Sequence, residues 1–221
     1  MKKLVTTNTK RIALLVIVLS TLAAFKAKKT NVLIIGDSIS IGYTPFVQKS
    51  LKGKAEVFHN HRNAQHTGNG LEKIHSWIKG KKWDVIQFNW GLWDLCYRHD
   101  KSKEPGKSDK VNGKITYRIE EYAKNLEKLV SILESTGAKL IFVTTTYVPE
   151  QEAGRFQEDP IKYNRVAKEI MKKHNIQVND IFETSIKVHK EYGNGNDDVH
   201  YSKEGYAKLS EPIIKMLEKH I

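Results

Sequence analysis

Short apolar segments alternate with amphipathic segments along most of the chain, and this alternation is the feature that most restricts the fold. The apolar segments are a few residues long and rich in β-branched residues, which is typical of strands buried on both faces of a sheet. The segments between them repeat apolar residues every three or four positions, as helices packed on one side do. The alternation predicts a three-layer α/β/α sandwich with a mostly parallel central sheet.

The expected elements can be placed by residue number. A chain of 221 residues with 39% hydrophobic and 28% charged residues has room for one globular domain with a full core. Pro45 limits how early the first helix can begin. The polar segment 98–114 has no apolar period, so it is predicted to be a mobile loop. Strands are expected at 31–35, 55–58, 83–91, 140–145 and 176–178, and helices at 41–51, 71–78, 119–133, around 166–170, around 181–188, and after Ser202 through Leu217.

The first 27 residues have the pattern of an export leader. Four basic residues between positions 2 and 11 precede an apolar run at 12–25, which is short for a membrane span. We therefore expect residues 1–27 to be a signal peptide or an N-terminal membrane anchor, and residues 28–221 to form the functional domain. The protein is then exported, to a periplasm or the outside of the cell, or tethered to a membrane by an uncleaved leader.

The charge and the cysteine content exclude some classes of function. The net charge is +12, but the lysines are spread over the chain without a nucleic-acid motif, so they are interpreted as solvated faces and no nucleic-acid partner is expected. Cys96 is the only cysteine, which rules out a disulfide within the chain. It is expected to be a buried core thiol.

A serine follows the first predicted strand directly. The strand ends at Gly36, and Asp37 and Ser38 precede the next amphipathic segment. A residue on such a turn lies at the carboxyl edge of a parallel sheet, where crevices form and where the free N–H groups of the next helix point. Ser38 is therefore placed as a nucleophile would be, although Asp37 or Ser38 alone could equally cap a helix.

A histidine and two carboxylates lie near the other end of the chain. Asp197 and His200 are three positions apart, so both can face the same way in a turn or a nascent helix. A carboxylate can then fix one imidazole nitrogen while the other faces a hydroxyl, which is what a weak alcohol nucleophile needs. The spacing favours Asp197 as the partner of His200, with Asp198 as the alternative.

Gly-Asp-Ser at 36–38 together with Asp-x-x-His at 197–200 resembles the SGNH/GDSL hydrolase (esterase/lipase) superfamily. The resemblance extends from Asn31 to Leu217 by motif order. It implies a flavodoxin-like sandwich and a serine esterase in which Ser38 is the nucleophile, His200 the base and Asp197 the orienting carboxylate. It implies no metal and no organic cofactor.

The donors for the oxyanion depart from the pattern of this superfamily, which uses the N–H of the serine, a backbone N–H of a second motif and the asparagine of Gly-x-Asn-Asp. Here the third motif, 91–94, has Trp93 in place of that asparagine. The indole N–H of Trp93 or the amide of Asn89 could replace it. For the backbone donor of the second motif, Ala64 is favoured over Gly68.

Other polar residues near the expected site have alternative interpretations. His59, His61 and His66 contain metal-ligand types, but without a helix or a carboxylate among them they are interpreted as solvated loop residues, so no metal site is predicted. Arg62 and Arg98 flank the expected crevice and could recognise an anionic or hydroxyl-rich substrate, or could be surface residues.

The sequence therefore predicts a serine esterase that hydrolyses carboxylic esters through an acyl-serine intermediate. Neither flanking loop has the apolar run of a lipid-binding lid, which favours short acyl groups, such as acetyl on a carbohydrate, as in an acetylesterase. One alternative is a lysophospholipase or thioesterase. Another is a catalytically weak carbohydrate-binding protein on the same scaffold, which Trp93 would suit because an indole ring stacks on sugars.

Overall fold

The computed structural model describes residues 29–221, and its centre is a five-stranded parallel sheet. The strands are β1 (Thr30–Ile35), β2 (Ala55–His59), β3 (Val85–Phe88), β6 (Lys139–Val143) and β7 (Gln177–Asn179), in the order β2-β1-β3-β6-β7. This is the strand order of flavodoxin-like folds. The predicted α/β sandwich with a parallel sheet is confirmed, while the predicted leader, 1–27, lies outside the described residues.

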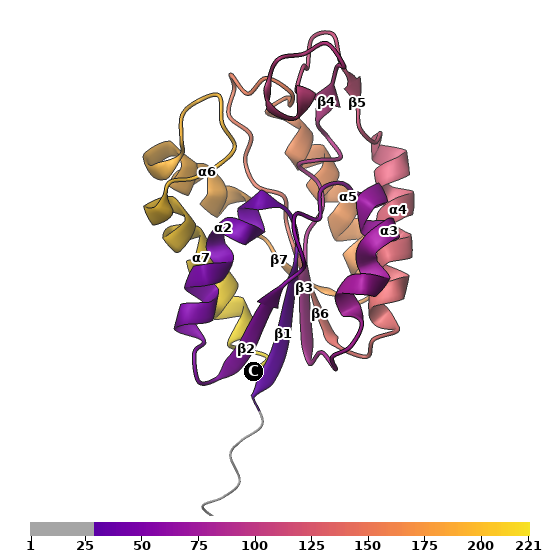
Figure 1. The fold of residues 1–221 in the computed structure, drawn as a ribbon, viewed down its shortest axis with the longest axis vertical. Coiled ribbons are helices and arrows are strands. Elements are labelled where there is room, and N and C mark those ends of the chain that lie inside the picture. The colour runs from indigo at the N-terminus through magenta and orange to yellow at the C-terminus, as the bar shows by residue number, and fades with distance from the viewer. Residues whose placement is uncertain (1–28) are drawn as a thin grey trace, which may run out of the picture.

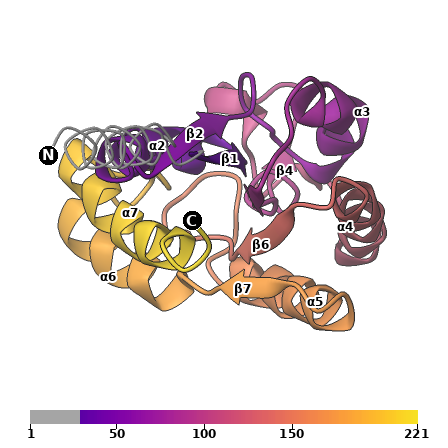
Figure 2. The ribbon, with the colours of Figure 1, turned by 90° about the horizontal axis from the view of Figure 1, so that it is seen from below.

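Three helices cover each face of the sheet (Figures 1 and 2). On one side lie α2 (Ser38–Ser50), α6 (Phe182–Tyr192) and α7 (Lys203–Leu217), and on the other α3 (Thr67–Ile78), α4 (Ile119–Glu134) and α5 (Asp159–Lys173). None of these helices is long and apolar enough to cross a bilayer, a finding that extends to residues 29–221 alone.

Strand β1 is apolar at every position from Val32 to Ile35. Val32 and Ile34 belong to the core shared with α2, α6 and α7, whereas Leu33 and Ile35 belong to the core shared with α3, α4 and α5. Successive side chains of a strand point to opposite faces, so a strand covered on both sides must be apolar at every position. All four side chains are at most 2% exposed.

The carboxyl end of β1 is the point where the strand order reverses. From β1 the chain continues to β2 on one side and later returns to β3 on the other side. At such a switch point the connecting loops diverge and leave a crevice, which is where ligands bind in open α/β folds. The residues directly after Ile35 therefore lie at the position in the fold best suited to a site.

Helix α2 begins three residues earlier than predicted. Asp37 caps it, because its Oδ1 accepts a hydrogen bond from the Ile39 N–H at 3.0 Å. Pro45 lies inside the helix, where it removes only the bond to the carbonyl of residue 41. Ile41 is on the exposed side of the helix, so water can replace that bond.

The polar segment after β3 is folded rather than irregular. Within it, β4 (Tyr97–Arg98) pairs antiparallel with β5 (Lys114–Ile115), and a 3₁₀ turn, η1 (Pro105–Lys107), lies between them. This insert, residues 97–117, lies above the carboxyl edge of the sheet (Figure 1). The Tyr97 N–H donates to the Gly154 carbonyl and the Lys110 N–H to the Ala153 carbonyl, each at 2.7 Å. Backbone hydrogen bonds hold the insert, and such bonds produce no apolar period in the sequence. The prediction of a mobile loop is therefore corrected: the segment is folded.

Candidate active site

The turn that carries Ser38 is held by the segment after β2. The Gly36 N–H donates to Asn60 Oδ1 and the Gly36 carbonyl accepts from the Ala64 N–H, both at 2.9 Å. A Cβ on Gly36 would lie 2.6 Å from Ser40 Oγ, so the turn requires glycine there. Ser38 is the first residue of α2, and its N–H has no acceptor within the helix.

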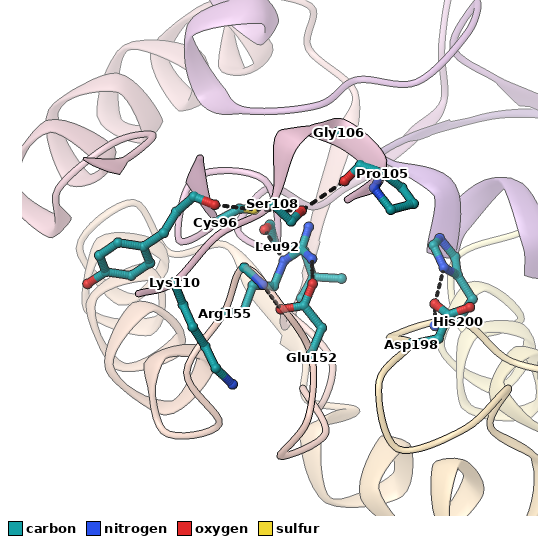
Figure 3. Close-up of polar contacts among 12 residues, drawn as sticks. Leu92, Cys96, Pro105, Gly106, Ser108, Lys110, Glu152, Arg155, Asp198 and His200 are labelled. Carbon is teal, nitrogen blue, oxygen red and sulfur yellow. Dashed lines mark hydrogen bonds and ion pairs between the residues drawn. The ribbon is translucent and has the colours of Figure 1, made fainter. Parts of the chain in front are cut away.

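Ser38 meets His200 across the switch-point crevice. Ser38 Oγ lies 2.9 Å from His200 Nε2, although the two residues are 162 positions apart. His200 Nδ1 lies 2.5 Å from Asp198 Oδ1, and this pair is visible in Figure 3. A carboxylate only accepts, so Nδ1 carries the proton and Nε2 is free to accept the proton of the serine hydroxyl.

Asp198, and not Asp197, is the carboxylate beside His200. The prediction of Asp197 assumed a turn or nascent helix, but residues 194–201 lie in a non-helical connection between α6 and α7. There, residues two apart share a side, and Asp198 Oδ1 also accepts the His200 backbone N–H at 2.9 Å. The Asp197 side chain is exposed at the rim of the crevice.

The pKa of Asp198 lies below its ordinary value. Desolvation raises this pKa, but the hydrogen bonds from the His200 backbone and ring and the charge of His200 together outweigh it. The carboxylate therefore remains ionised at neutral pH. In that form it holds the Nδ1–H tautomer of His200 and can stabilise an imidazolium.

His189 supports the connection that carries Asp198, and no sequence pattern pointed to it. Its Nε2 lies 2.7 Å from the Asp198 carbonyl oxygen, which can only accept, so Nε2 carries a proton. The ring packs between Tyr147 and Tyr201 at centroid distances of 5.4 and 5.3 Å. These contacts fix the backbone on which the carboxylate of Asp198 is mounted.

A pocket of about 480 Å³ opens beside Ser38 and His200. The insert borders it through Arg98 and η1, and the segment after β6 through a buried ion pair. In that pair, Arg155 Nη1 lies 2.6 Å from Glu152 Oε1, and the two residues are only 8% and 5% exposed. Figure 3 shows the pair across the pocket from Asp198 and His200. Glu152 and Arg155 lie in an irregular segment without a motif, so sequence analysis missed both.

The family model for GDSL-like lipase/acylhydrolase matches residues 32–213. The chain belongs to this family. A search of curated proteins found no match. The motifs at 36–38 and 197–200 both lie in this matched region, which covers nearly the whole described fold. The protein is therefore a serine hydrolase.

Solved structures with the same fold include esterases and lipases. A lipase/acylhydrolase from Enterococcus faecalis has a TM-score of 0.69 at 20% identity, with 86% of this chain and 96% of that one covered. An acetyl xylan esterase, AlAXEase, has a TM-score of 0.67 at 16% identity over 85% and 99%. An acetyl xylan esterase from Geobacillus stearothermophilus has a TM-score of 0.66 at 18% identity over 89% and 99%. At such identities the likeness shows the fold.

Two of the oxyanion donors predicted for this GDSL-like hydrolase are not available. The Ala64 N–H is already bonded to the Gly36 carbonyl, and its side chain is fully buried. Asn89 Nδ2 donates to the Val143 carbonyl at 2.8 Å and so ties β3 to β6. Both groups lie near the carboxyl edge of the sheet, but each already donates a hydrogen bond to an acceptor within the fold.

Of the other two predicted donors, one borders the Ser38 pocket and one does not. Gly68 is the second residue of α3, and a Cβ there would lie 2.1 Å from Tyr117 Oη, so the ring of Tyr117 covers it. Trp93 lines the pocket. The Ser38 N–H has no acceptor within α2 and Trp93 borders the pocket, so these two groups stay the predicted donors to an oxyanion.

His59, His61 and His66 have separate roles, and His59 is the last residue of β2 instead of a loop residue. His59 Nε2 lies 2.7 Å from Ser40 Oγ, and His66 Nδ1 accepts the Asn69 N–H at 3.0 Å and caps α3. His61 is exposed. Across residues 29–221 no three His, Cys, Asp or Glu side chains group as metal ligands would. Arg62 lies on the outer side of α2, beside Pro45, and away from the Ser38 pocket.

Asp94 of the third motif is a buried carboxyl. Thr67 donates to it twice, through its backbone N–H at 3.0 Å and its hydroxyl at 2.5 Å. Desolvation raises the pKa of Asp94 to about 7, although the Thr67 bonds oppose the rise. The contact joins the start of α3 to the loop after β3, below the pocket.

This raised pKa makes the free energy of unfolding depend on pH. Between pH 4 and 7 the folded carboxyl keeps a proton that the unfolded chain has lost, so the free energy of unfolding falls as the pH rises, by about 1.4 kcal/mol per pH unit. Asp94→Asn removes this titration. Urea unfolding at pH 5 and pH 8 should show that the variant loses about 2 kcal/mol less than the wild type over this interval. If the wild type and the variant lose the same free energy of unfolding between these two pH values, the raised pKa of Asp94 is contradicted.

Proposed function

We propose that this GDSL-like hydrolase removes short acyl groups, acetyl in particular, from esters of a carbohydrate. The observation that carries the proposal is the line of contacts from Asp198 through His200 to Ser38, which ends in a pocket bordered by several charged and polar side chains. A serine activated in this way attacks ester carbonyls, and the walls of the pocket restrict which ester can approach.

The geometry accounts for each step of acyl transfer. His200 Nε2 takes the Ser38 proton as Oγ attacks the carbonyl carbon, and the Ser38 N–H at the helix start faces the developing oxyanion. The resulting imidazolium, stabilised by Asp198, gives the proton to the sugar oxygen as its bond to the carbonyl carbon breaks, and the sugar leaves as an alcohol. Water activated by His200 then attacks the acyl-serine and releases the acid.

The pocket walls favour a short acyl group. Burying one methylene in an apolar site contributes about 0.8 kcal/mol. Among the residues that line this pocket, Leu92, Trp93 and Val199 are the large apolar ones, and charged side chains border them. A long acyl chain would therefore gain little, which disfavours a lysophospholipase or thioesterase.

Two observations support a carbohydrate as the alcohol part. The partly exposed indole of Trp93 offers an apolar face in the pocket, while guanidinium and carboxylate groups beside it suit hydroxyl groups. In addition, two of the solved structures with this fold are named acetyl xylan esterases.

The experiment that tests the proposal is a chain-length series with the full-length protein. We expect kcat/KM for 4-nitrophenyl acetate to exceed that for the octanoate by about 10-fold or more. We also expect acetate release from acetylated xylo-oligosaccharides, with Ser38→Ala as the inactive control. A preference for octanoate would favour the lysophospholipase or thioesterase alternative. Absence of turnover in a folded sample would favour a binding protein.

A further inference from the structure

We infer that the pocket beside Ser38 binds an anionic group, a carboxylate or a sulfate, on the sugar that carries the ester, and that Arg98 and Arg155 hold it. This inference rests on the proposed function, because it names the class of carbohydrate ester that the same pocket accepts.

Arg155 is a buried cation, and one of its guanidinium nitrogens donates no hydrogen bond within the described residues. Its Nε donates to the Leu92 carbonyl at 2.7 Å and its Nη1 to Glu152, so two of its three nitrogens are committed. Within residues 29–221, Nη2 has no acceptor. Figure 3 shows this nitrogen directed away from Glu152, toward the insert that borders the pocket. Arg155 lines the pocket, so a ligand in the pocket can accept a hydrogen bond from this nitrogen.

Arg98 approaches the same pocket from the insert. Its guanidinium carbon lies 4.5 Å from the centroid of the Trp93 ring, a cation–π contact that holds the group beside the indole. Its Nε donates to Thr116 Oγ1 at 3.3 Å, and its Nη1 donates to the Gly106 carbonyl. Again one nitrogen, Nη2, is left without an acceptor in the described part of the chain. Both arginines therefore present one spare donor each to one pocket.

The charges around these two groups leave room for an anion. Both arginines line the same pocket, and burial is the main cause that lowers the pKa of Arg98, with the charge of Arg155 acting in the same direction. Of the carboxylates that line the pocket, Glu152 is bonded to Arg155 and to the Gly154 N–H, and Asp198 is bonded to His200.

The remaining carboxylates do not neutralise the pair. The side chains of Glu104 and Asp197 are exposed at the rim, where water and salt screen their charges, and neither forms an ion pair with an arginine. Asp37 precedes Ser38 and is buried; burial raises its pKa, and the charge of Arg155 acts in the opposite direction. A planar or tetrahedral anion between two guanidinium groups would accept charge-assisted hydrogen bonds from both.

The test separates this inference from the proposed function by measuring binding instead of turnover. Calorimetry with full-length Ser38→Ala would compare galacturonate and galactose 6-sulfate with neutral galactose. We expect one or both anionic sugars to bind about 10-fold more tightly than galactose or better. A gain for the carboxylate alone or for the sulfate alone would support the inference and define the anion.

The matched variants are made in the same Ser38→Ala background. Arg98→Gln should reduce the preference for the anionic sugar about 10-fold. Arg165→Gln, which removes an arginine from the exposed face of α5, should leave it unchanged. The double variant Glu152→Gln/Arg155→Gln gives a second test that does not leave a buried charge unpaired, and it should also reduce the preference.

Two results would overturn the inference: equal binding of neutral and anionic sugars, or a preference that survives both the Arg98 and the Arg155 changes. Acetate release by the wild-type protein is measured separately. If the preference is present but no sugar ester is hydrolysed, the anion site stands and the proposed carbohydrate esterase is wrong.

Discussion

Replacement of Asp198 by asparagine is expected to lower kcat about 10³- to 10⁴-fold, because an amide neither holds the Nδ1–H tautomer of His200 nor stabilises the imidazolium. Asp197→Asn is the matched control. It removes the same charge one residue away, from an exposed side chain that does not contact His200, and should lower kcat less than about 5-fold.

The measurement is steady-state hydrolysis of 4-nitrophenyl acetate by both variants, with thermal unfolding to confirm that each is folded. A structural role for Asp198 would lower stability without the selective loss of kcat. If Asp197→Asn instead abolishes turnover while Asp198→Asn retains it, the orienting carboxylate is the one that the i, i+3 spacing favours.

Replacement of Arg155 by glutamine is expected to lower the free energy of unfolding by about 3 to 5 kcal/mol. The cause is Glu152, which is 5% exposed and would remain buried as an uncompensated charge. The double variant Glu152→Gln/Arg155→Gln should regain most of this loss, since a neutral side chain needs no cation beside it.

The matched control is Lys168→Gln, which breaks an ion pair with Asp180 at the surface, where both side chains are more than 40% exposed. Water screens such a pair, so the loss should be below about 1 kcal/mol. Urea unfolding of the four proteins gives the comparison. Equal stability of the Arg155→Gln variant and the double variant would show that the buried charge of Glu152 does not cause the loss.

The layers of the fold could be predicted because the spacing of apolar residues along a strand or helix indicates which of its faces are buried. The apolar run in β1 and the three- and four-residue spacing in α4 each report which faces are covered. The same local signals place Ser38 at a strand end and His200 ahead of the last helix. Once the sheet is parallel, the strand ends meet at one edge, which places Ser38 there, and His200 reaches it from the connection between α6 and α7.

Hydrogen-bond partners could not be predicted in this way. Asp197 and Asp198 are neighbours in the sequence, where the spacing favours Asp197, but the choice between them depends on a backbone that His189 and the neighbouring turns hold in a non-helical path. Ala64 and Asn89 have the right chemistry for an oxyanion, but acceptors from the first turn and from β6 already occupy them.

The sequence by itself thus determined the sandwich, the edge of the sheet that carries the site and two side chains that meet there. Only the tertiary structure decided which carboxylate faces His200, which donors remain free, and that Arg155 and Glu152 form a wall of the pocket. The physical reason is the distance along the chain over which each kind of information acts. Burial repeats with the period of a helix or strand, whereas a hydrogen bond depends on the position of one atom brought from elsewhere in the chain.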